Sequence, residues 1–353
     1  MPLSNANVVS QTPIIAPKAL KSEFPLSDKA RNTVQAGREA VQNILMGLDK
    51  RLLVIVGPCS IHNVEQALEY TGRLEALRQK YLENLFIVMR VYVDKPRTTV
   101  GWRGFLQDPD MDFSNNFEKG LKLTRQLMLE VNELGMPVAT ELLDPFIPQY
   151  IDDLLSWGAI GARTTESQTH RAMSSGISVP VGFKNSTEGN VQIALDAIQS
   201  ARKPHSFLGI DGEGRAAVFG TRGNAFGHVI LRGGRGGTNF SPEHTSSTAA
   251  QLEKAGLNPR LLVDCSHHNS GYDHTKQQIA LDSVLEARSA GQLETVGVML
   301  ESNLMPGKQG IPQDHSELNY GVSVTDACIG WEETEKVLED AAKQVRAEGV
   351  VRS

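Results

Sequence analysis

Eight short segments of the chain are rich in apolar residues and lack the polar alternation of a strand with one face in water. Continuous apolar runs of this kind are typical of strands buried on both faces, as in a parallel sheet. The first run ends at Gly57 and Pro58, and proline has no amide hydrogen for a sheet ladder. The predicted strands are Leu52–Gly57, Phe86–Tyr92, Pro137–Leu142, Ala159–Ala162, Val179–Phe183, His228–Leu231, Leu261–Cys265 and Val296–Leu300.

Helix-like stretches separate these strands. Strands that alternate with helices indicate an α/β protein with a parallel sheet, and eight strands are the number that closes a (β/α)8 TIM barrel. A doubly wound open sheet is the competing architecture, but no G-x-G-x-x-G turn follows the first strand. The predicted helices are Val64–Tyr81, Phe117–Leu134, Pro148–Trp157, Asn190–Ala201, Thr245–Ala255, His274–Ala290 and Glu332–Ala347.

Residues 1–50 lie outside this repeat and form a predicted N-terminal extension. Met1–Lys18 is polar and contains proline, as in a mobile or partner-bound arm, and a helix capped by Ser27 should follow it. The extension either closes the bottom of the barrel or serves regulation or oligomerisation. Residues 51–353 form the predicted catalytic barrel, with an insertion at about 205–226 before strand six. Two apolar runs flank Asp211–Gly214 in that insertion, which predicts a β-hairpin.

Composition and charge narrow the function classes. The net charge of -6 at pH 7 speaks against nucleic acid as a partner. No apolar run is long enough to span a bilayer and no signal segment precedes the barrel, so we expect a cytoplasmic protein without a membrane partner. Three cysteines are an odd number for a disulfide framework and indicate reduced thiols.

Six cations are predicted to converge at one end of the barrel, because each lies at or just after a strand's carboxyl end. In barrels of this kind the chemistry collects there. Guanidinium groups suit bidentate binding of phosphate and carboxylate, so the site should bind small, strongly anionic molecules. A single cation of this kind is usually a solvated surface charge, but six at strand ends are not explained that way. The cations are Arg90, Lys95, Arg97, Arg163, Lys184 and Arg232.

A second set at the same end combines a thiol, an imidazole and two carboxylates. Cys59 follows the first strand, His267 the seventh and Glu301 the eighth, with Asp326 beyond. This mixture suits one divalent ion of Mn, Fe, Co or Zn better than Mg or Ca, which prefer oxygen ligands only. On spacing alone, His268 or His62 could take the place of His267. A lone cysteine such as Cys59 could also be a small buried hydrophobe.

Longer motifs resemble those of the microbial type I 3-deoxy-D-arabino-heptulosonate 7-phosphate (DAHP) synthases. The resemblance covers nearly the whole chain, from about Phe24 to Val345. The motifs are GPCSIH at 57–62, MRVY at 89–92, KPRTTVGW at 95–102, GAIGARTTES at 158–167, PVGFKN at 180–185, ILRGG at 230–234 and TDAC at 325–328.

The resemblance implies condensation of phosphoenolpyruvate with D-erythrose 4-phosphate, the entry to the shikimate pathway. It places phosphoenolpyruvate on five cations, erythrose phosphate on the loop after strand two, and the metal on four ligands. It also selects His267 over His268, as the first histidine after an Asp-x-Ser motif. The implied sets are Arg90, Lys95, Arg163, Lys184 and Arg232 for phosphoenolpyruvate; Lys95, Arg97 and Thr98 for erythrose phosphate; and Cys59, His267, Glu301 and Asp326 for the metal.

The expected mechanism uses the metal as a Lewis acid on the aldehyde, while the cations neutralise the phosphates and align the reacting carbons. Water then adds to C2, steered by Glu141 or by a metal-bound position. A Schiff base on Lys184 is the alternative, but neighbouring arginines and an anionic ligand favour an electrostatic role. The expected catalytic residues are therefore Lys95, Glu141, Lys184 and His267.

Feedback regulation also follows from the resemblance. In regulated members the arm and the hairpin build a site for an aromatic amino acid, here expected near Gln149, Ser178, Phe207 and Phe219. Tyr or Phe is the favoured effector, and a homodimer or homotetramer the expected assembly. The alternatives are a 3-deoxy-manno-octulosonate 8-phosphate synthase, which carries a Lys-Ala-Asn-Arg-type motif where this chain has KPRTT, and a non-catalytic barrel that senses an effector.

Overall fold

Eight parallel strands close into a barrel in the computed structural model, which describes the backbone of residues 3–351 and the side chains of residues 3–345. Met1, Pro2, Arg352 and Ser353, at the ends of the predicted ranges 1–50 and 51–353, lie outside the described residues. The order around the barrel is β1-β10-β9-β8-β5-β4-β3-β2. The strands are β1 (Leu52–Gly57), β2 (Leu85–Arg90), β3 (Val138–Glu141), β4 (Trp157–Ile160), β5 (Val181–Lys184), β8 (Gly227–Leu231), β9 (Leu261–Asp264) and β10 (Thr295–Glu301). The predicted (β/α)8 barrel is confirmed.

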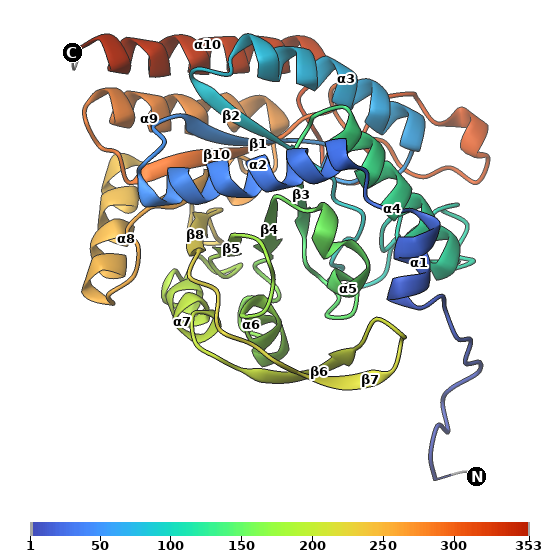
Figure 1. Ribbon diagram of the computed structural model, residues 1–353. Helices are drawn as coiled ribbons and strands as arrows, with labels where there is room; N and C mark the ends of the chain where they lie inside the picture. The colour runs from blue at the N-terminus through green and yellow to red at the C-terminus, as the bar shows by residue number, and fades with distance from the viewer. Residues whose placement is uncertain (1–2, 352–353) are drawn as a thin grey trace.

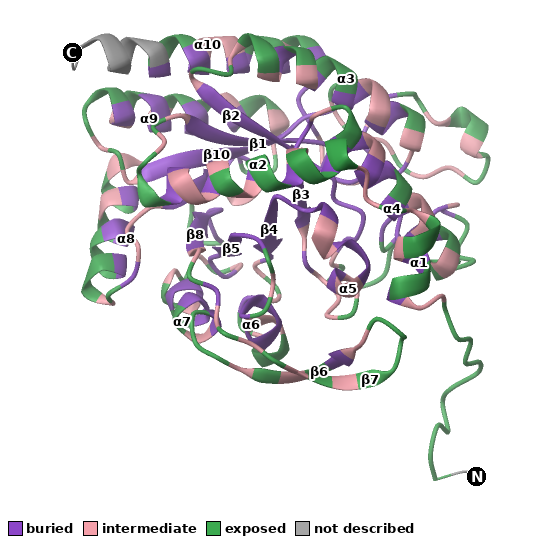
Figure 2. Ribbon diagram, in the orientation of Figure 1, coloured by how far each residue is buried: buried purple, intermediate pink, exposed green. Residues whose placement is uncertain are grey.

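Helices cover the outside of the barrel, and both faces of its strands are buried (Figure 1, Figure 2). The outer helices pack on the strands through one large apolar cluster, while a second cluster fills the barrel interior. The helices after β1 are α3 (Val64–Lys80), α4 (Phe117–Glu133), α5 (Pro148–Ile151), α6 (Gln168–Ser174), α7 (Gln192–Ala201), α8 (Pro242–Lys254), α9 (Gln277–Ser289) and α10 (Trp331–Val351).

Helix α2 (Asp28–Met46) closes the end of the barrel opposite the strands' carboxyl ends. Ser27 caps it, as predicted, by accepting a hydrogen bond from the amide of Ala30. Its Val41, Ile44 and Leu45 join the cluster inside the barrel. Gly37 faces Ser156, and any side chain at position 37 would collide with that residue. This part of the extension therefore acts as a plug at the barrel bottom.

Three local predictions differ from the structure. The predicted helix Pro148–Trp157 stops at Ile151, continues as a 3-10 turn over Asp152–Leu154, and Trp157 already belongs to β4. Helix α6 was not expected. Part of the predicted mobile arm belongs to a short helix, α1 (Pro17–Glu23), which begins with a proline at its first position.

The inserted hairpin consists of β6 (Ser206–Ile210) and β7 (Ala216–Gly220), an antiparallel pair apart from the barrel (Figure 1). Phe207 and Phe219 lie opposite each other and their rings stack, with centroids 5.5 Å apart. The tip of the hairpin meets α1, because the amide of Lys18 donates to the Gly212 carbonyl at 2.8 Å. The arm and the hairpin, far apart in sequence, thus lie together.

The three cysteines are free and buried, which confirms the prediction of reduced thiols. Among the described residues, no helix combines the length and the apolarity needed to cross a bilayer.

Candidate functional site at the carboxyl end of the barrel

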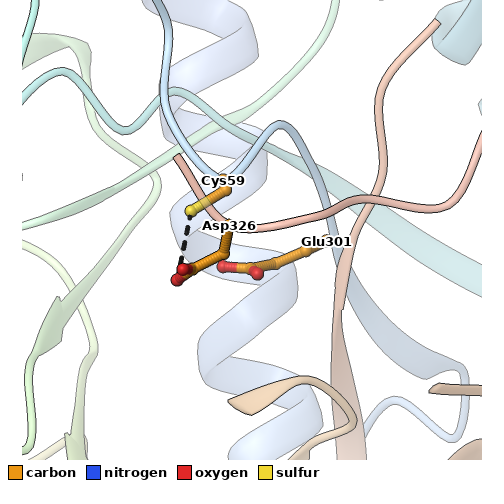
Figure 3. Close-up of side chains that lie close together, drawn as sticks. All are labelled: Cys59, Glu301 and Asp326. Carbon is orange, nitrogen blue, oxygen red and sulfur yellow. Dashed lines mark hydrogen bonds between the residues drawn. The ribbon is translucent and has the colours of Figure 1, made fainter. Parts of the chain in front are cut away.

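Three side chains from distant parts of the chain meet at the carboxyl ends of β1 and β10 (Figure 3). Cys59 follows β1, Glu301 is the last residue of β10, and Asp326 lies in the long segment between β10 and α10. One ligand atom from each lies within 4.8 Å of the others, and the Cys59 Sγ is 3.7 Å from the Asp326 Oδ2. Cys59 and Glu301 are buried and Asp326 is half-buried. The structure therefore brings three of the four predicted metal ligands into one cluster.

Two buried cations border this cluster. The Lys95 Nζ donates to the Cys59 Sγ at 3.2 Å, and the Arg90 Nη2 donates to the Glu301 Oε1 at 3.1 Å. Burial raises the pKa of the Cys59 thiol to about 11, and Glu301 adds to the effect while Lys95 opposes it. Burial alone would raise the pKa of Glu301, but His267, Arg90 and Lys95 hold it at about 2. The carboxylate is thus already charged, whereas the thiol must lose its proton to act as a ligand.

His267 lies beside the cluster rather than within it. Its Nε2 is 4.0 Å from the Glu301 Oε1, and its Nδ1 is 2.9 Å from the Asp264 Oδ2. The backbone of His267 has a φ of 54°, a left-handed conformation that non-glycine residues adopt at some energetic cost. Such strain persists only where the surrounding structure holds it, and it is common at functional sites. The imidazole is therefore aimed with one nitrogen toward Asp264 and the other toward Glu301.

The two alternative histidines are placed differently. The His268 Nδ1 lies 2.6 Å from the Arg232 Nη1, from which it can accept a hydrogen bond, and its ring packs edge-on against Tyr272. His62 is buried, its Nε2 has no hydrogen-bond partner, and burial lowers its pKa to about 4. Neither is within the cluster of Cys59, Glu301 and Asp326.

The predicted cations divide into a buried group and a more exposed group. Arg90, Lys95, Lys184 and Arg232 are all less than 9% exposed. The more exposed group lies on the rim of the barrel mouth and consists of Arg97 and Arg163, together with the predicted Thr98. The Arg163 Nε donates to the Thr98 Oγ1 at 3.1 Å, and the Arg97 Nε donates to the Trp102 carbonyl at 2.7 Å. The loop that carries Arg97 and Thr98 is thus tied to the segment after β4.

Asp264, the last residue of β9, joins two predicted functional groups. Its Oδ2 lies 2.7 Å from the Lys184 Nζ and 2.9 Å from the His267 Nδ1, and its Oδ1 accepts from the amide of Ser266. Burial would raise the pKa of Asp264, but His267 and Lys184 hold it well below its usual range. Asp264 was not among the predicted site residues, although its place at a strand end was the signal that could have found it.

Glu141 ends β3, and its carboxylate faces the segment that follows β4. Gly161 leaves room for its carboxylate, because a side chain at position 161 would overlap with it. Glu141 also lines a void of about 10 Å³, with Asp94 and Pro148 among the other residues around it. The Oδ2 of Asp94 is buried there without a partner, and burial raises the pKa of Asp94 to about 6.

A larger cavity of about 340 Å³ lies between α5, the end of α6 and the hairpin. Gln149, Phe207 and Phe219, three of the four predicted effector residues, line it. Ser178 does not line it directly, but its Oγ donates to the Oδ2 of Asp152, a lining residue, at 2.6 Å. Three of the four residues thus line one cavity, separate from the Cys59 cluster, and the fourth is bonded to a residue of its wall.

Comparison with known proteins adds a family to this geometry. The sequence profile described as the DAHP synthetase I family matches residues 23–339. The Tyr-sensitive phospho-2-dehydro-3-deoxyheptonate aldolase of Salmonella typhimurium is 48% identical over 350 residues, 99% of this chain and 98% of the relative. The Phe-sensitive enzyme of Escherichia coli K12 is also 48% identical, over 95% of each chain. The solved phospho-2-dehydro-3-deoxyheptonate aldolase of Francisella tularensis has a TM-score of 0.95 at 46% identity, covering 97% of this chain and 99% of its own.

Proposed function

This chain belongs to the DAHP synthetase I family, so its reaction is the condensation of phosphoenolpyruvate with D-erythrose 4-phosphate, and we propose which of its residues perform that reaction. The family fits the site, because buried cations and a thiol-carboxylate cluster occur at one end of a parallel barrel. The observation that carries the assignment of residues is the meeting of Cys59, Glu301 and Asp326 from three remote segments.

The metal would be held by Cys59, His267, Glu301 and Asp326. The donor set fits a divalent Mn, Fe, Co or Zn ion, because it mixes a thiol, an imidazole and two carboxylates. Burial of Cys59 and Glu301 fits a site shielded from water, and the Nδ1 of His267 beside Asp264 leaves Nε2 as the ligand atom. When bound, the ion would supply Lewis-acid polarisation of the aldehyde oxygen.

Phosphoenolpyruvate would bind to Arg90, Lys95, Arg163, Lys184 and Arg232. The four buried cations are already oriented by internal partners, such as Glu301 for Arg90 and Asp264 for Lys184. Charges held in place before the substrate arrives stabilise developing charge without reorganisation. Lys95, Arg97 and Thr98 would face the phosphate of erythrose 4-phosphate from the rim loop.

The chemistry then follows from this placement. C3 of phosphoenolpyruvate attacks the aldehyde carbon as its C2=C3 double bond opens, and the aldehyde oxygen takes up a proton to become a hydroxyl group. Water then adds to the electron-poor C2 and loses a proton, and the C2–O bond to phosphate breaks as the second proton leaves and C2 becomes the ketone. We assign Glu141 to steer the water, since it is the carboxylate at the end of β3 on the same side of the barrel. Lys184 is paired with Asp264 and serves to neutralise the substrate's charge. The cytoplasm is the proposed compartment.

The 340 Å³ cavity is the proposed site for an aromatic amino acid effector. Stacked Phe207 and Phe219 offer an aromatic wall, and Gln149, Asp152 and Arg222 offer polar and charged groups for an α-amino acid. Tyr or Phe is the proposed effector, in keeping with the Tyr-sensitive and Phe-sensitive relatives. The cavity lies apart from the Cys59 cluster, so binding there would act on the reaction indirectly.

We also propose a homodimer or a homotetramer. The arm exposes Val8, Val9 and Ile14, and the hairpin exposes Leu208 and Val218 opposite each other. An isolated two-stranded sheet is marginally stable, and exposed apolar side chains on both segments favour burial against another copy. Sedimentation of the full chain and of a chain without residues 1–20 tests this, and a monomer at micromolar concentration would refute it.

The test of the proposed function is a paired assay on the purified protein with Mn²⁺. Phosphate release and DAHP formation are expected from phosphoenolpyruvate and erythrose 4-phosphate. A parallel assay replaces erythrose 4-phosphate with arabinose 5-phosphate, the substrate of the alternative enzyme. Cys59→Ser and Asp326→Asn should each reduce the activity at least a hundredfold. Turnover of arabinose 5-phosphate alone, or full activity of both variants, would overturn the assignment.

A further inference from the structure

Strand β9 stops short of the end of β10. In a parallel sheet the backbone groups of alternate residues face the same neighbouring strand. Met299 faces β9, because its carbonyl accepts from the amide of Cys265 at 2.9 Å, and Ser302 faces β1, because its amide donates to Gly57 at 3.0 Å. Glu301 therefore faces β9 again. However, β9 ends at Asp264, opposite Met299, and the chain then turns away into the segment of His267.

A side chain fills the place that β9 leaves. Gln277, the first residue of α9, is 1% exposed. Its Oε1 accepts from the amide of Glu301 at 2.8 Å, and its Nε2 donates to the carbonyl of Glu301 at 2.9 Å. The side-chain amide of Gln277 thus bonds both backbone groups of Glu301. The Glu301 carbonyl has one further donor, the amide of Ile329 at 3.0 Å.

These two bonds hold the backbone from which the Glu301 side chain extends. The side chain is held at its far end by the Arg90 Nη2 at 3.1 Å and by the Ser266 Oγ at 2.9 Å. With Gln277 at the backbone, Glu301 is fixed at both ends. We infer that Gln277 is a positioning residue that holds Glu301 in place as a metal ligand. This inference rests on the proposed function, in which Glu301 is one of the four ligands.

The inference predicts an effect on metal affinity and not only on stability. Groups that orient a ligand typically change metal affinity ten- to a hundredfold when they are removed. A role limited to packing α9 against the barrel would lower thermal stability and leave the affinity of the folded protein unchanged. Metal binding by the apoprotein separates these cases without any measurement of turnover.

The experiment is a Co²⁺ titration of the metal-free protein, followed by the thiolate-to-cobalt charge-transfer absorption and by competition with a chelator. Gln277→Met keeps the side-chain length and removes both hydrogen bonds, and we expect the Kd to rise at least tenfold. Gln278→Met is the matched control, because Gln278 is the next residue, is partly exposed and pairs with Asp282 on the helix surface. Its Kd should stay within twofold of the unaltered protein.

A second variant keeps the test decisive if Gln277→Met does not fold. Gln277→Glu retains an acceptor for the Glu301 amide, and we expect a Kd raised at least threefold. An unchanged Kd and an unchanged absorption band in a folded Gln277 variant would overturn the inference. Glu301→Gln serves as the check on the premise. If Glu301→Gln binds Co²⁺ as tightly as the unaltered protein, the assignment of Glu301 as a ligand is wrong.

Discussion

The stacked pair in the hairpin offers a direct test of the effector cavity. Phe219 lies 5.5 Å from Phe207, with 18° between the ring planes, and both rings line the 340 Å³ cavity. Phe219→Ala removes one ring of this wall. The pair that Phe219 would form with the aromatic ring of a bound effector contributes about 0.5–1.5 kcal/mol beyond the area it buries. The loss of the contact area between Phe219 and the effector adds to this. A total of about 1–2 kcal/mol corresponds to a five- to thirtyfold rise in the inhibition constant, at about 1.4 kcal/mol per factor of ten.

The assay compares inhibition curves for Tyr and Phe with the uninhibited rate. Val218→Ala is the matched control, because Val218 is the neighbouring residue in β7, is 70% exposed and does not line the cavity. We expect Val218→Ala to leave the inhibition constant unchanged, and neither variant to alter kcat. An inhibition constant unaffected by Phe219→Ala would refute the placement of the effector. A fall in kcat equal to the loss of inhibition would refute the separation of the two sites.

Three further predictions follow from buried polar groups. Burial lowers the pKa of His228 from 6.5 to about 4, so the unfolded chain binds the extra proton first as pH falls. The free energy of unfolding should therefore drop by about 3 kcal/mol between pH 6.5 and 4. His228→Gln should remove that part of the slope in urea unfolding. A chelator should abolish activity and Mn²⁺ restore it, whereas borohydride with erythrose 4-phosphate, the substrate that carries a carbonyl group, should leave no adduct on Lys184 by mass spectrometry. Lys184→Met should raise the KM for phosphoenolpyruvate at least tenfold in steady-state kinetics, since a hydrogen bond to a charged group contributes about 1.5–3 kcal/mol.

The barrel could be predicted because its strands are buried on both faces. Such strands need continuous apolar segments, and the segment Leu52–Val56 contains only apolar residues. The missed elements are short and depend on their surroundings. Helix α6 has seven residues and begins at the Ser167 cap, too few for an apolar stripe to stand out. The chain after Pro148 has apolar residues at a helical spacing, but β4 takes Trp157 because its indole reaches His228 inside the barrel at 3.1 Å.

The meeting of Cys59, Glu301 and Asp326 could be predicted for a related reason. A closed parallel barrel brings all strand ends to one mouth, so Cys59 and Glu301 need no short spacing in sequence to meet. The supporting residues carry no such signal. Gln277 begins a helix and looks like any polar residue at a helix start, and its role depends on where β9 stops. The same holds for Asp264, whose Oδ2 lies close to both the Lys184 Nζ and the His267 Nδ1 because of the strained turn after β9.

The connection between the proposed effector cavity and the mouth of the barrel is short. Glu141 ends β3 at the mouth, and α5 begins at Pro148, so six residues separate the two. Pro148 borders both the 340 Å³ cavity and the small void beside Glu141. Packed protein interiors transmit displacement because they contain little empty space. A ligand that shifts α5 must therefore also change the packing around Glu141 and Asp94, and the latter is adjacent to the buried Lys95 that donates to Cys59. If the effector binds as proposed, a displaced turn at Pro148 would connect its cavity to Glu141 without a rearrangement of the barrel.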